Sequence, residues 1–263
     1  MASTQLSEPP RLDAGEPPQL DSPAICLLGG PYVIQAGRRI AVPEGSKKLL
    51  AFVALHDGRV DRRHVAGTLW PYVSDDRASG NLRSALWRLK GAGIGVLEAD
   101  KVFIALRDQT SIDIYVLRDW AGRVIGGAAQ STDLVLPAWS LEALDLLPGW
   151  YDDWVIFERE RLRQRLLHGL EALCCQLIRL ERYAEAVEVA MEAVDIDPLR
   201  ESAQRVLVEA HLAEGNVVEA RRIYKAYSAL VTQELGVLPG SRIRGLIERT
   251  EPAPVRAADT YRR

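Results

Sequence analysis

The amino-acid sequence predicts a mainly α-helical protein with a small β component, divided into two domains. Two patterns predict this class. Residues 25–108 combine short strand patterns with three helical segments, and residues 109–250 are helical almost throughout. A length of 263 residues, 48% of them hydrophobic, is enough for two modest cores. Residues 1–24 hold five of the 14 prolines, which predicts a disordered lead-in, and residues 251–263 are expected to be a tail.

The first domain begins with short strands. Residues 24–43 read as strands punctuated by turns at Gly29-Gly30-Pro31 and Ala36-Gly37. Strands this short are not stable alone, so we expect them to pack on the helices that follow.

Three helical segments come next. Residues 46–56 carry a broad apolar face and are followed by Gly58, which we expect to close the helix. Residues 62–69 follow Asp61, and residues 74–91 begin at Ser74; both residues can act as N-caps.

The third helix is amphipathic. Leu82, Ala85, Leu86 and Leu89 recur at helical spacing and form one apolar stripe. At about 100° per residue, the opposite face collects polar and aromatic side chains. These are Arg77, Gly80, Asn81, Ser84, Trp87 and Arg88, with Arg83 at the edge.

Residues 95–106 follow as a predicted β-hairpin around Lys101. Strands, three helices and a terminal hairpin are the order of a winged helix-turn-helix domain, whose third helix enters the major groove of DNA. Arg and Asn side chains can read base edges there. We therefore expect DNA contacts from Arg77, Asn81, Ser84 and Arg88, with Arg83, Trp87 and Lys90 secondary and Lys101 directed towards the DNA backbone. Trp87 packing against the second helix is an equal alternative. Lys47 and Lys48 are expected to be solvated, with a contact to phosphate as the alternative.

The charge supports nucleic acid as the partner of this domain. The net charge is −3, but residues 25–108 hold 13 Lys and Arg against 8 Asp and Glu. This local excess of +5 lies on an otherwise acidic chain, which suggests that one domain binds a polyanion.

No enzyme or cofactor signature is present. The sequence has no Gly-x-Ser-x-Gly elbow, no HExxH and no cysteine or histidine at metal-ligand spacing. We expect no cofactor, no metal and reduced thiols at Cys26, Cys174 and Cys175. The N-terminus lacks the apolar core of a signal peptide, and no apolar run could span a bilayer, so a cytoplasmic protein with no membrane partner is expected.

The second domain contains a repeat. Predicted helices cover residues 113–125, 153–180 and a short segment near 140–146. Residues 182–186 (RYAEA) then align with residues 216–220 (NVVEA) at a period of 34, which is the tetratricopeptide signature. The repeats are imperfect, because Thr232 stands where Pro198 stands in the first unit. Trp150, Tyr151 and Trp154 are expected to be core at the domain junction.

Several motifs carry a family resemblance. They are Leu69-Trp70-Pro71 and residues 81–89 (NLRSALWRL), 146–154 (LLPGWYDDW), 158–161 (ERER), 197–202 (DPLRES), 210–216 (AHLAEGN) and 234–237 (ELGV). In this order they resemble the Streptomyces antibiotic regulatory protein (SARP) family, which joins a winged helix-turn-helix to a bacterial transcriptional activator domain. The resemblance implies a sequence-specific activator that binds direct repeats near promoters of secondary-metabolite genes and recruits RNA polymerase.

Three further expectations follow. No GxxxxGK[ST] loop occurs, so the nucleotide-binding module of some relatives is not expected in this chain. No heptad zipper would enforce a two-fold dimer, which favours head-to-tail self-association on double-stranded DNA in the nucleoid. The alternative function is a helical-repeat adaptor whose winged helix binds protein instead of DNA.

Overall fold

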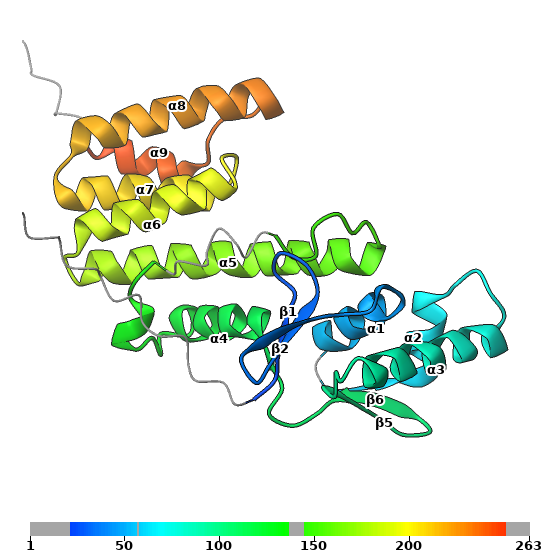
Figure 1. The fold of residues 1–263 in the computed structure, drawn as a ribbon. Helices are drawn as coiled ribbons and strands as arrows, with labels where there is room; N and C mark the ends of the chain where they lie inside the picture. The colour runs from blue at the N-terminus through cyan, green and yellow to red at the C-terminus, as the bar shows by residue number, and fades with distance from the viewer. Residues whose placement is uncertain (1–21, 57, 137–144, 251–263) are drawn as a thin grey trace, which may run out of the picture. The chain divides into compact units, whose positions relative to one another are not determined.

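The structure, a computed structural model, describes residues 22–56, 58–136 and 145–250. The chain falls into two compact units that divide between Asp113 and Ile114 (Figure 1). The first unit holds the strands and three helices, and the second is helical. The predicted class, mainly α with a small β component, is confirmed.

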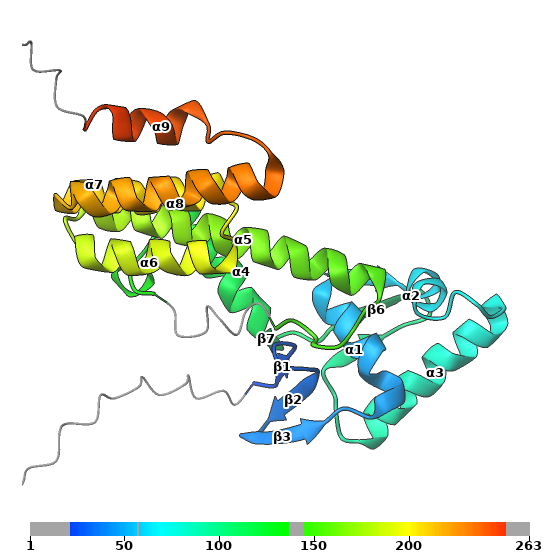
Figure 2. The same cartoon turned by 90° about the horizontal axis from the view of Figure 1, so that it is seen from above.

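The first unit starts with a four-stranded sheet in the order β3-β2-β1-β7. Its strands are β1 (Ala24–Cys26), β2 (Tyr32–Gln35), β3 (Arg38–Ala41) and β7 (Ser111–Ile112). β1 pairs antiparallel with β2 and parallel with β7. Ala36 and Gly37 both have positive φ, as a two-residue hairpin turn requires, and this turn sets Gln35 opposite Arg38 (Figure 2).

The three helices and the hairpin follow in the order of a winged helix-turn-helix. They are α1 (Glu44–Leu55), β4 (Arg59–Asp61), α2 (Arg62–Leu69), α3 (Asp75–Gly91), β5 (Leu97–Ala99) and β6 (Phe103–Leu106). The last two strands form the predicted hairpin, called the wing below, and β6 also pairs with β4. The arrangement confirms the predicted winged fold.

The ends of the three helices confirm one predicted N-cap and correct two other predictions. The Asp61 carboxylate accepts hydrogen bonds from the backbone N–H groups of Arg63 (2.8 Å) and His64 (3.0 Å), so α2 begins where predicted. Ser74 occupies the N-cap position of α3 but makes no side-chain cap bond, which corrects its expected role. α1 (Glu44–Leu55) begins directly after Pro43, two residues before its predicted start, and ends one residue before its predicted end; its C-cap is His56 and not the expected Gly58.

The second unit opens with α4 (Asp113–Ile125), as predicted, and a 3-10 turn, η1 (Ser131–Asp133). The Trp120 indole donates to the carbonyl of Asp133 (3.1 Å), and the Arg123 guanidinium forms two 2.8 Å bonds with its carboxylate. These bonds hold the turn against α4. A helix was also expected near residues 140–146. Most of this range belongs to residues 137–144, which lie outside the described residues.

The rest of the second unit is a stack of helices. α5 (Asp153–Arg179), α6 (Tyr183–Ile196), α7 (Glu201–Glu214) and α8 (Val217–Leu235) pack in sequence, and α9 (Ser241–Glu248) packs on α7 and α8 (Figures 1 and 2). α6 and α8 begin 34 residues apart, which confirms the predicted period. α6 ends just before Asp197-Pro198, whereas α8 runs through Thr232, where no proline stops it.

Small side chains lie at the helix crossings. Ala186 and Ala220, which occupy equivalent positions of the repeat, are both fully buried. Ala220 belongs to a core cluster with Val208, Tyr227 and Ile243. A small residue at these points lets neighbouring helices approach closely.

The three aromatic residues around the start of α5 are buried to different extents. Trp150 and Trp154 are half-buried, with their ring centroids 6.2 Å apart in an edge-on arrangement. Tyr151 is 82% exposed, so its assignment to the core was wrong.

Other expectations concern thiols, metals and membranes. Cys174 is buried, and burial raises the pKa of its thiol. Within the described residues, no group of histidine, cysteine and carboxylate side chains could hold a metal ion. In the same residues, no helix combines the length and apolarity that crossing a bilayer requires.

We predict that Ala220→Leu lowers the free energy of unfolding by about 1–3 kcal/mol, because the added isopropyl group overpacks the cluster. Thermal and urea unfolding followed by circular dichroism would measure this. Val218→Leu is the matched control, since Val218 lies on the same helix and is 82% exposed. Equal stability of the two variants would contradict a close crossing at Ala220.

Candidate nucleic-acid interface

α3 buries one stripe and leaves its other face open. Ala78, Leu82, Ala85 and Leu89 are buried, at intervals of four, three and four residues, as one face of a helix requires. Most of the predicted contact residues are exposed. These are Arg77, Arg83, Ser84, Trp87 and Lys90 on α3 and Lys101 on the wing.

Two of the predicted residues lie on the flank of the helix. Asn81 and Arg88 are half-buried. They stand roughly 90° round the helix axis from the centre of the buried stripe. Trp87, in contrast, is 74% exposed, so the alternative in which its indole packs on the second helix was wrong.

Arg88 is the main correction, because its side chain packs on α1 instead of extending from an open face. Its Nη2 donates to the carbonyl of Gly45 (3.0 Å), and its Nε is buried without a hydrogen-bond partner in the described residues. A Cβ at position 45 would lie 2.8 Å from Nη2, so a side chain there would displace the guanidinium. Nearby, the buried Ser46 hydroxyl donates to the carbonyl of Ala85 (2.8 Å). Arg88 therefore holds α3 against the first turn of α1.

A cationic hollow of about 630 Å³ lies beside α3. Arg62 and Arg63 from the start of α2, Arg83 and Ser79 from α3, and Lys101 from the wing all line it. Arg83 and Lys101 were predicted separately, and the fold brings them together. Four cations converging from three elements are suited to an anionic ligand.

Arg62 and Arg63 are candidate site residues that sequence reasoning missed. They occupy the first turn of α2, where the positive end of the helix dipole disfavours cations. Two arginines directly after an N-cap aspartate are therefore a local conflict, and such conflicts are typical of functional sites. That signal was available in the sequence.

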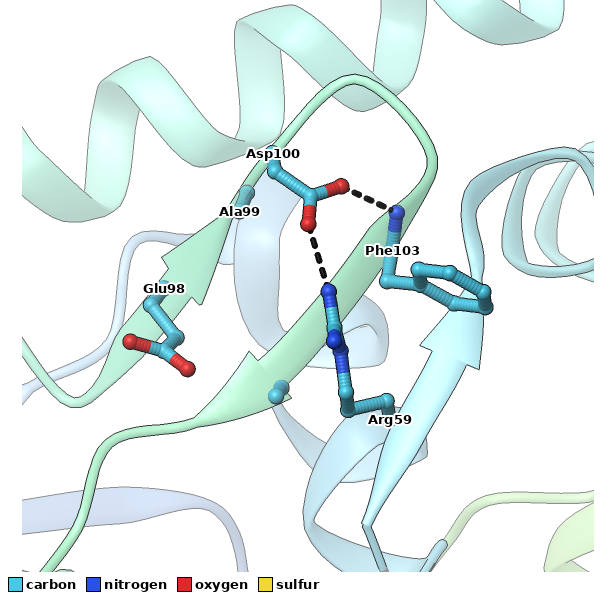
Figure 3. A pocket seen from close by; sticks show the side chains of 6 residues that line it. Arg59, Glu98, Ala99, Asp100 and Phe103 are labelled. Atoms are coloured by element: carbon cyan, nitrogen blue, oxygen red, sulfur yellow. Dashed lines mark hydrogen bonds and ion pairs between the residues drawn. The ribbon is translucent and has the colours of Figure 1, made fainter.

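The wing meets α2 at a turn built on Asp100, the one carboxylate among the described residues that line the cationic hollow. Its Oδ1 accepts from the N–H groups of Val102 and Phe103, both at 2.7 Å. Its Oδ2 pairs with Arg59 at 2.6 Å, and the Arg59 guanidinium lies 4.6 Å from the centre of the Phe103 ring (Figure 3). The two backbone N–H groups, followed by Arg59, hold the pKa of the Asp100 carboxyl below its usual range.

A smaller hollow of about 210 Å³ lies on the Arg59 side of the wing, lined also by Glu98 and Phe103 (Figure 3). Lys47, expected to be solvated, pairs with Glu44 at 2.6 Å in the first turn of α1. It does not line the cationic hollow.

The chain joins a winged helix-turn-helix unit to a unit of stacked helices. Residues 117–250 match the bacterial transcriptional activator domain family. The chain therefore belongs to the family of transcriptional regulators that carry this domain, the Streptomyces antibiotic regulatory proteins.

Two known proteins are similar to this chain, one in sequence and one in fold. The regulatory protein AfsR of Streptomyces griseus is 28% identical over 214 residues, covering 77% of this chain. The match spans 22% of the length of AfsR. The solved structure of Mycobacterium tuberculosis EmbR in complex with a low-affinity phosphopeptide is similar in fold, with a TM-score of 0.63 and 19% identity over 88% of this chain and 66% of that chain.

We predict that Arg88→Ala lowers the free energy of unfolding by about 0.5–1.5 kcal/mol, the usual contribution of one hydrogen bond. Arg83→Ala, on the exposed side of the same helix, should change it by less than about 0.5 kcal/mol. Chemical unfolding of the two variants makes the comparison. Indistinguishable stabilities would show that Arg88 does not hold α3 to α1.

Proposed function

We propose that this protein is a sequence-specific transcriptional activator that binds double-stranded DNA through α3 and the wing. The observation that carries the proposal is the exposed face of α3, with Arg77, Ser84 and Trp87, next to the cationic hollow. An α-helix fits the major groove, where arginine and hydroxyl side chains can hydrogen-bond base edges. The hollow offers Arg62, Arg63, Arg83 and Lys101 to the phosphates on the flank.

The roles of these groups differ. Phosphate contacts position a protein on DNA, whereas contacts to base edges specify the sequence. We assign Arg62, Arg63 and Lys101 to phosphates, and Arg77 and Ser84 to base edges. Asn81 and Arg83, on opposite flanks of α3, are placed where the helix would meet the walls of the groove.

The second unit supports the activating role. Stacked helix pairs present an extended surface that suits a protein partner. We propose RNA polymerase as this partner, at promoters of a secondary-metabolite gene cluster in the nucleoid. A single winged helix reads only a few base pairs, so two copies are proposed to bind direct repeats head to tail.

The first test is whether the protein binds DNA through contacts to phosphates. The logarithm of DNA affinity should fall linearly with the logarithm of salt concentration, with a slope of about −0.9 per phosphate neutralised. Arg63→Ala should make the slope less steep by about 1 and weaken binding to all sequences alike. Fluorescence anisotropy with duplex DNA at several salt concentrations would measure both quantities.

The matched control for this test is Arg222→Ala, because Arg222 is an exposed arginine of the second unit. The salt dependence of DNA affinity in Arg222→Ala should have the same slope as in the wild-type chain. If the wild-type chain does not bind duplex DNA, or binds it independently of salt, the DNA-binding proposal is wrong and the adaptor function is favoured.

The second test concerns the direct repeats. Insertion of about 5 base pairs between two half-sites rotates one site to the opposite side of the duplex, whereas about 10 base pairs restore its phase. Cooperative binding in a gel-shift assay should be lost with the first insertion and return with the second. Tighter binding after inversion of one half-site would instead indicate a two-fold dimer.

A further inference from the structure

The tip of the wing is held by contacts on both sides of Lys101. Before it, Asp100 receives the three hydrogen bonds described above, and its carbonyl accepts from Nη1 of Arg62 (3.1 Å). After it, the carbonyl of Val102 accepts from the backbone N–H of Arg62 (2.8 Å). The backbone that carries Lys101 is therefore fixed against the start of α2.

Asp100 is the group on which these contacts converge. Its carboxylate binds its own turn through two backbone N–H groups and binds β4 through Arg59. The Arg59 side chain is in turn supported by the Phe103 ring from the other strand of the wing (Figure 3). Removal of the carboxylate would remove two bonds within the turn and the ion pair with Arg59 together, and would leave the tip held by backbone contacts alone.

We propose that Asp100 is a positioning residue for DNA binding: it fixes the tip of the wing so that Lys101 faces the cationic hollow, and it thereby strengthens binding although its own charge repels phosphate. The proposal rests on the proposed DNA-binding function and adds to it a role for an acidic residue. Asp100 makes no contact with DNA in this role.

Two effects of opposite sign act at this position. A carboxylate near phosphates weakens binding by repulsion, but this carboxylate is about half exposed and is offset by Arg59, so solvent and the ion pair reduce its field. A wing tip that has lost these bonds, in contrast, would have to be ordered when DNA binds, and Lys101 with it. The geometry points to ordering as the larger effect.

The test compares two carboxylates of the same wing in the full chain. Asp100→Ala and Glu98→Ala each remove one negative charge, but the Glu98 side chain, on the exposed part of β5, makes no hydrogen bond or ion pair with other described residues. Asp100→Ala should weaken binding to duplex DNA by about three- to tenfold, the range expected when one long side chain must be ordered on binding. Glu98→Ala should leave binding unchanged or tighten it.

Two readouts separate positioning from a general loss of structure. Lys101→Ala should weaken binding less in the Asp100→Ala background than in the wild-type chain, because Lys101 is then already misplaced. Hydrogen exchange of the free chain should become faster at the Val102 and Phe103 amides in Asp100→Ala, with exchange in α1 unchanged. Asp100→Asn, which keeps an acceptor for these amides, should lie between Asp100→Ala and the wild type in both measurements.

Opposite results overturn the proposal. If Asp100→Ala tightens DNA binding as Glu98→Ala does, Asp100 acts only through its charge. Full additivity with Lys101→Ala, or unchanged amide exchange, would also overturn it. If the wild-type chain fails to bind DNA while Asp100→Ala still speeds amide exchange, the DNA-binding function itself is wrong, and Asp100 only stabilises the turn.

Discussion

The first unit depends on how α3 is fixed while one of its faces stays open. A helix that buries Ala78, Leu82, Ala85 and Leu89 is held along one stripe only, and it could still slide or roll by small amounts. The bonds from the Ser46 hydroxyl to the carbonyl of Ala85 and from Arg88 to the carbonyl of Gly45 resist this movement. Directional bonds at the edge of an apolar contact therefore set where the exposed side chains of α3 point, as a preorganised binding site requires.

The cationic hollow holds arginine side chains at a helix end whose dipole repels them. Arg62 and Arg63 sit at the positive end of α2, but the Asp61 carboxylate caps that end, and the carbonyls of Asp100 and Val102 accept bonds from Arg62. The backbone thus compensates for part of the repulsion without neutralising the guanidinium groups. The remaining positive charge is available to an anionic partner.

The sequence predicted what depends on local pattern and missed what depends on neighbours in space. The bounds of α2 and α4, the wing and the 34-residue period followed from capping residues, periodicity and repeats. Arg88 was misplaced because it lies on the flank of α3, where Gly45 of α1 stands beside it, and a helical projection does not show which neighbours a flank residue meets. Arg62 and Arg63 were missed because only the fold brings the start of α2 next to Arg83 and Lys101.

The motifs that carried the family resemblance explain why the fold was predicted better than the partners. Within residues 197–202, Arg200 bonds Glu171 of α5 at 2.6 Å with both side chains largely buried, and Glu201 accepts from the N–H of Gly240 ahead of α9 (2.7 Å). These side chains join helices to one another, and they are not free to contact another molecule. A resemblance that rests on such residues reports how the helices pack. The identity of a partner depends instead on exposed residues such as Arg77, Arg83 and Lys101, whose pattern alone does not specify a DNA sequence.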